Sequence, residues 1–162
     1  MSHNPYAPPR AEVLDAAAAD SRHGASVSAR LYSVNQLFAA AFIGSPIAAA
    51  WFAAYNLRAL GEPNQARRIV LWGLLATAAA MALAFFLPDG TPNTALPLAY
   101  SFAIRALGEK AFKGALGDHS QAGGVLASWW RVVGVSLLWL LLTIVGVIAM
   151  FLALEQLGFS PE

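Results

Sequence analysis

Two long apolar segments without any charged residue constrain this chain more than any other feature of its sequence. Residues 37–57 form a run of 21 such positions, and residues 69–87 form a run of 19. A helix rises about 1.5 Å per residue, so each run reaches about 30 Å, the thickness of the hydrocarbon core of a bilayer. Charged residues make up only 12% of the chain, against about a quarter in an ordinary soluble domain. The sequence therefore predicts an all-α integral membrane protein.

Two further segments complete a predicted helical bundle of about four transmembrane helices. The segment 92–107 follows the turn sequence PDGTPN and would reach about 24 Å as a helix. Arg105, Glu109 and Lys113 recur every four residues with alternating charge, which favours continuation of this helix into water. The last predicted span, 129–154, begins with a Trp-Trp-Arg sequence typical of the membrane interface.

The predicted membrane domain covers residues 31–157 and is flanked by two polar tails. Residues 1–30 are mixed in charge and rich in proline at their start, so we expect a flexible tail, and residues 158–162 form a short C-terminal one. A cleaved signal peptide is not expected, because the first long apolar run starts only near Leu37.

Basic residues are distributed unevenly among the predicted connections. The 58–68 connection carries three Arg and the 105–131 stretch carries four basic residues, whereas the 88–93 turn and the C-terminal tail carry none. Basic connections face the cytoplasm in most membrane proteins. This alternation predicts that 92–107 spans the membrane and that both basic connections are cytoplasmic.

The first apolar segment is interrupted at Gly44, Ser45 and Pro46, a helix break and possible functional hinge that allows two topologies. A single kinked span would place the N-terminal tail and its three Arg outside. A re-entrant hairpin over 31–57 would keep all ten Lys and Arg residues inside, although its halves are too short to span. Irregular backbone at membrane depth needs surrounding protein, and a small chain offers little. We therefore favour the single kinked span.

Small residues recur at helical spacing on the first two predicted spans. Such stripes let helix backbones approach closely, either within one chain or between a chain and its partner. The first span carries Ala41, Ser45, Ala49 and Ala53, and the second carries Gly73, Ala76, Ala80 and Ala84.

The sequence contains no recognisable catalytic, cofactor-binding or metal-binding constellation. Asp118 and His119 are the one weak candidate pair, because a histidine beside a carboxylate suits acid–base chemistry. A zinc site needs three or four ligands, and the other two histidines lie in the N-terminal tail. No cysteine is present, which excludes disulfides and thiolate sites. The net charge of +1 gives no reason to expect nucleic acid as a partner.

Several sequence stretches resemble uncharacterised multi-pass inner-membrane proteins of Gram-negative bacteria. They are the NPYAPP start, Tyr32 and Gln36 before the interrupted apolar segment, NLRALGE after it, and LASWWRVVG at the start of the last span. The resemblance implies a location in the bacterial inner membrane, with no assigned activity.

Two functional hypotheses follow. The leading one is a non-enzymatic membrane protein, partnered by the lipid bilayer, that acts through helix packing in a homo-oligomer or with a partner subunit. The alternative is a small oligomeric transporter or channel component in which the Gly44 to Pro46 break lines a cavity, as discontinuous helices do in transporters. Neither hypothesis requires a cofactor.

Overall fold

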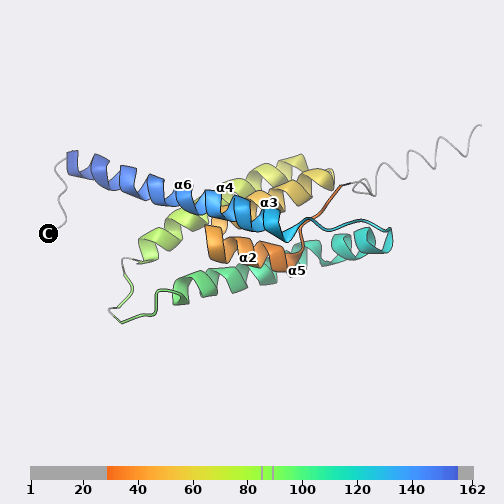
Figure 1. Ribbon diagram of the computed structural model, residues 1–162, viewed down its shortest axis with the longest axis horizontal. Coiled ribbons are helices and arrows are strands. Elements are labelled where there is room, and N and C mark those ends of the chain that lie inside the picture. Colours follow the sequence, from red (N-terminus) through yellow and green to blue (C-terminus); the bar gives the residue numbers. More distant parts are fainter. Residues whose placement is uncertain (1–28, 85, 89, 157–162) are drawn as a thin grey trace, which may run out of the picture.

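The computed structural model describes residues 29–84, 86–88 and 90–156, and within them the chain is all-α, as predicted. Residues 1–28 of the predicted N-terminal tail and the whole predicted C-terminal tail, residues 158–162, lie outside the described residues. In these described ranges five helices follow one another, with no strand between them (Figure 1). They are α2 (Val34–Gly44), α3 (Pro46–Ala59), α4 (Pro63–Ala84), α5 (Ala95–Gln121) and α6 (Trp129–Gln156).

The first apolar segment is a hairpin of two helices, α2 and α3. Asn56, near the end of α3, makes two hydrogen bonds to the backbone of Tyr32, just before α2. Its Nδ2 donates to the Tyr32 carbonyl oxygen at 2.8 Å, and its Oδ1 accepts from the Tyr32 N–H at 2.8 Å. The rings of Tyr32 and Phe52 also lie 4.5 Å apart between centroids. The two ends of the segment are thus side by side. The segment is therefore a helical hairpin, and the prediction of a single kinked helix over 37–57 is wrong.

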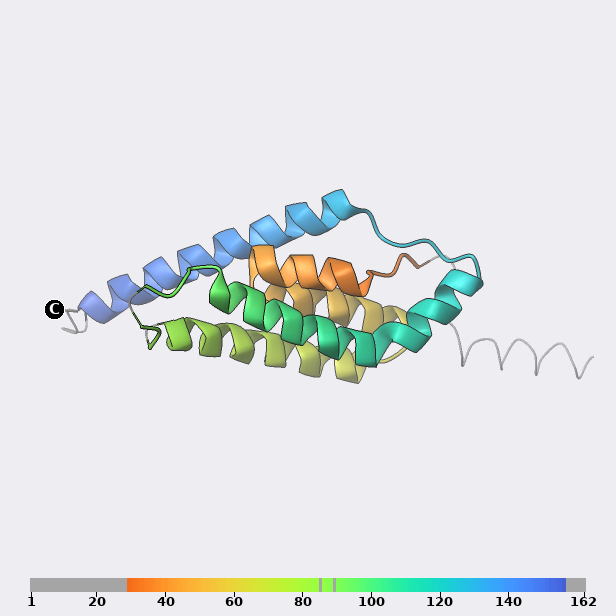
Figure 2. The same ribbon diagram turned by 90° about the horizontal axis from the view of Figure 1, so that it is seen from below.

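This hairpin occupies the centre of the molecule, between α4, α5 and α6 (Figure 2). Helix α3 packs mainly on α4, while α2 packs on α5 and α6. Most of the buried core comes from the hairpin, including Leu37, Ala40, Ala41, Ala49, Phe52, Ala53 and Ala54. The many alanines are the physical reason that so short a chain can cover the turn, because small side chains let three outer helices approach a central pair.

The three outer helices differ in how well they match the predicted spans. Both α4 and α6 are long and apolar enough to cross a membrane, by length and composition. Helix α5 is longer than predicted, at 27 residues, and does not share that apolar character. Two of the described helices thus have the length and composition of membrane spans, and the predicted bundle of four spans is not confirmed. The expected pair on α5 is present, with Arg105 Nε 3.1 Å from Glu109 Oε1.

Candidate functional site

The hairpin reverses direction at Ser45, in a backbone conformation that L-residues rarely adopt. Ser45 has φ 89° and ψ 167°, a region occupied almost only by glycine. Its N–H still donates to the carbonyl of Ala41 at 3.0 Å, which closes α2. Pro46 then starts α3, at a position where the missing N–H needs no partner. The predicted break is thus a sharp turn, strained by about 1–3 kcal/mol at Ser45.

The tip of the hairpin is fixed to α4 and to α6. The Ile47 N–H donates to Thr77 Oγ1 at 3.0 Å, and this hydroxyl donates to the Gly73 carbonyl at 2.8 Å. On the other side Gly44 lies against the backbone of Ser136, so close that a Cβ on Gly44 would meet the Ser136 carbonyl oxygen at 2.5 Å. These contacts hold the strained turn in place.

Three serine hydroxyls near this tip are buried without a hydrogen-bond partner in the described part of the chain: those of Ser45, Ser101 and Ser136. Ser136 packs against Gly44. Ser101 directly precedes Phe102, whose ring contacts that of Phe38 in α2. Because α5 runs antiparallel to α2, Ser101 lies level with the last turns of α2. Buried hydroxyls are almost always satisfied by protein or by ordered water. Ser45 also lines a cavity beside the tip, whereas Ser101 and Ser136 do not.

A cavity of about 560 Å³, named here the tip cavity, lies between Ser45, the last turns of α4, the first turns of α5 and the middle of α6. Its polar lining includes Ser45, Thr77, Tyr100 and Thr143, and the rest is largely apolar. None of the described residues that line it is charged. This composition suits a small, uncharged molecule with a few hydrogen-bonding groups.

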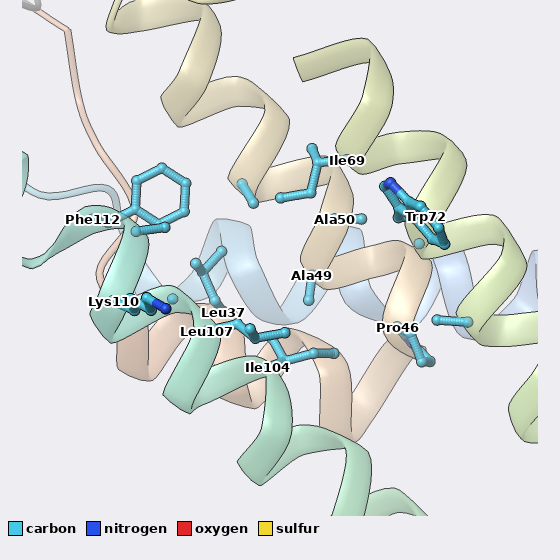
Figure 3. Close-up of a pocket in the computed structure, with 15 residues that line it drawn as sticks. Leu37, Pro46, Ala49, Ala50, Ile69, Trp72, Ile104, Leu107, Lys110 and Phe112 are labelled. Carbon is cyan, nitrogen blue, oxygen red and sulfur yellow. The ribbon is translucent and has the colours of Figure 1, made fainter. Parts of the chain in front are cut away.

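A second hollow of about 620 Å³, named here the α4–α5 groove, opens on another side of the hairpin. Figure 3 shows Ile104, Leu107 and Lys110 of α5 facing Ile69 and Trp72 of α4 across a floor formed by the hairpin. Helices α4 and α5 each pack on the hairpin and make little contact with each other. The groove is apolar apart from Lys110 at its edge.

The predicted small-residue stripes are placed differently on the two segments. Ala41, Ala49 and Ala53 are buried in the hairpin, as expected for close packing. On α4, Gly73 lies so close to Ala50 that a Cβ there would collide with the alanine side chain. The remaining stripe positions of α4 face outward or partly outward, namely Ala76 and Ala84, which are exposed, and Ala80, which is half-buried. The buried face of α4 runs instead through Ala66, Gly73 and Thr77.

The weak candidate pair is not brought together. Asp118 is exposed, whereas His119 is only 5% exposed and its ring lies against Gly124. His119 Nε2 has no hydrogen-bond partner among the described residues. No group of three or more His, Cys, Asp or Glu residues that could hold a metal ion occurs in the described ranges.

Sequence reasoning missed two structural polar residues. The Asn56 side chain closes the hairpin, and Gln36 Nε2 donates to the Ala127 carbonyl at 2.6 Å, which ties the start of α2 to the segment before α6. Ser33 and Gln36 also form a capping box at the start of α2. The Ser-x-x-Gln spacing before an apolar run is a recognised helix-start pattern and was available as a signal.

Comparisons with protein-family models, curated proteins and solved structures found no match. The function of this chain is therefore inferred from its own geometry.

Proposed function

We propose that the chain is a bacterial inner-membrane protein in which α4, α5 and α6 cross the bilayer and the α2–α3 hairpin is re-entrant. Large apolar side chains exposed on the outer helices support contact with lipid, among them Leu71, Leu75, Leu138 and Ile148. In this arrangement both ends of the hairpin lie on the side of the 58–68 and 105–131 basic segments. All ten Lys and Arg residues then share one side, in full agreement with the positive-inside rule.

The hairpin tip then lies near the middle of the membrane. Helix α2 has 11 residues and reaches about 16 Å, roughly half the hydrocarbon thickness. Substrate sites of many transporters lie at this depth, beside helices that are broken there. The tip cavity extends from Ser45 toward the 88–93 turn, on the side opposite the basic residues.

The function best supported is the binding of a small uncharged polar solute in the tip cavity, as a non-enzymatic component of a channel or transporter. Ser45 carries this proposal. A serine in a glycine-only conformation, with a buried unpartnered hydroxyl at the wall of a cavity, is unfavourable for stability alone. Strain of this kind concentrates at functional sites. None of the described residues that line the cavity is charged, which favours a polyol-type solute over an ion.

Solute flux into proteoliposomes tests the proposal. Vesicles containing the full chain are mixed with hyperosmotic glycerol, erythritol or xylitol, and swelling is followed by light scattering. We expect swelling faster than in protein-free vesicles, and a loss of that excess in the Ser45→Ala, Tyr100→Phe double variant. The matched control is Ser120→Ala, an exposed serine at the opposite end of the molecule. Equal swelling with and without protein, or an unchanged rate in the double variant, would contradict the proposal.

Helix packing with a second copy or a partner subunit stays the alternative hypothesis. It is favoured by Ala76 and Ala84, two positions of the predicted small-residue stripe that are exposed on α4. Crosslinking or native mass spectrometry in nanodiscs tests it, and a monomer without a copurifying protein is the result that would refute it.

A further inference from the structure

We propose that the α4–α5 groove is a binding site for an anionic phospholipid, with one acyl chain in the groove and the phosphate between Arg68 and Lys110. The inference rests on the membrane placement proposed above, but it does not depend on solute binding in the tip cavity. The two sites lie on different sides of the hairpin tip, where Pro46 and Thr77 separate them.

The groove has the depth and lining that an acyl chain requires. It runs along α4 from Ile69 to Ala76, about 10 Å, between the membrane boundary on the basic side and the hairpin tip. Its floor is made of small side chains, Ala49, Ala50 and Ala53, which leave the hollow open instead of filling it. An apolar hollow that faces the bilayer is filled by hydrocarbon, since it offers water no hydrogen-bond partners.

Two cations flank the basic end of this groove from opposite walls. Lys110 lies at its edge on α5, and Figure 3 shows it across the groove from Ile69 and Trp72. Arg68 precedes Trp72 by four residues on α4, so both side chains lie on one helical face and Arg68 is one turn nearer the membrane surface. Both cations are exposed, and neither belongs to an ion pair within the described ranges.

The level of these cations matches that of a phospholipid headgroup. Arg68 immediately precedes the apolar run that starts at Ile69, and Lys110 lies one turn beyond Leu107, where the apolar part of α5 ends. A lipid whose chain fills the groove therefore has its phosphate between them. Charge complementarity selects an anionic lipid over a zwitterionic one, and over an apolar partner helix, which would leave both cations unused.

Fluorescence of Trp72, which lines the groove, gives a direct test. The full chain is placed in phosphatidylcholine vesicles that contain increasing fractions of brominated phosphatidylglycerol or brominated phosphatidylcholine. The Trp72 signal is the difference between the protein and its Trp72→Phe variant. We expect the brominated anionic lipid to quench this signal with a higher relative binding constant, by about fivefold for each cation.

Matched charge removals separate the groove from the general basic surface. The Arg68→Gln, Lys110→Gln variant loses the preference for anionic lipid, whereas Arg67→Gln, Lys113→Gln, which removes one neighbouring charge from each of the same two helices, keeps it. All four positions are exposed, and circular dichroism verifies that both variants are folded.

Four results overturn the inference, and they are distinguishable. Equal quenching by the two lipids, or loss of the preference only in the Arg67 and Lys113 variant, shows that the groove does not select anionic lipid. Trp72 that is shielded while the other tryptophans are quenched shows that a second copy or a partner helix fills the groove. Absence of quenching for every tryptophan refutes the membrane placement itself, and with it the proposed function.

Discussion

Replacement of Ser45 by glycine and by alanine separates the backbone conformation of this residue from its hydroxyl group. Both variants lose the hydroxyl, but only glycine adopts φ 89° and ψ 167° without steric strain. The strain relieved is about 1–3 kcal/mol, whereas the additional conformational entropy that glycine loses on folding costs about 0.5–1 kcal/mol. We therefore expect Ser45→Gly to be more stable than Ser45→Ala by roughly 1 kcal/mol.

Unfolding in mixed micelles with increasing fractions of SDS, followed by circular dichroism, measures this difference. Solute flux is measured on the same two variants, and we expect both to be deficient because the hydroxyl at the cavity wall is absent. A glycine variant that is no more stable than the alanine variant would refute the strain argument. Full flux in the glycine variant would show instead that solute does not use the hydroxyl.

Three further perturbations test the hairpin and its surroundings. Asn56→Ala leaves the buried N–H and carbonyl of Tyr32 without partners, and the same unfolding assay should show that the free energy of unfolding falls by about 2–6 kcal/mol. A fall below about 1 kcal/mol would mean that water replaces the two hydrogen bonds of Asn56. Gly73→Leu should separate α4 from the hairpin and destabilise the protein by about 1–3 kcal/mol or more. Gly134→Leu should not destabilise it, because no atom lies within 4 Å of a Cβ added there, and similar losses of stability in both variants would contradict the observed packing of Gly73. A cysteine at Ala29 should react with impermeant reagent from the same side as one in the α3–α4 connection, and labelling from opposite sides would restore the single-span topology.

The helical character of this chain could be read from its sequence because apolar runs of membrane length admit few alternatives. The topology of the first run could not, since its length fits one crossing as well as two half-crossings. The decision depends on Asn56, which pairs with Tyr32 across 24 positions, and on the cover that α4, α5 and α6 together provide. Neither a long-range side-chain contact nor the cover from later helices leaves a periodic signal in the local sequence.

The candidate site was only partly accessible to the same reasoning. The Gly44 to Pro46 break was visible because proline and glycine interrupt helices for local reasons. The buried face of α4 could not be predicted, because alanine occurs on every face of that helix and a stripe of small residues can be drawn along several of these faces. Burial follows Ala66, Gly73 and Thr77, of which Gly73 lies against Ala50 and Thr77 binds the hairpin tip at Ile47. The unpartnered hydroxyls of Ser101 and Ser136 acquire meaning only once the tip lies beside them.

The link between the start of the hairpin and the segment before α6 has a consequence for biosynthesis. Ala127 donates its N–H to the Leu31 carbonyl at 2.8 Å and accepts from Gln36 Nε2, a residue 91 positions earlier in the chain. While the ribosome is still adding α4 and α5, these groups of the hairpin have no native partner, and the face of α2 that α6 covers is open. The native contacts of the hairpin with Ala127 and with α6 therefore form only after these later residues have been synthesised. Synthesis of α6 is then the step that completes the fold.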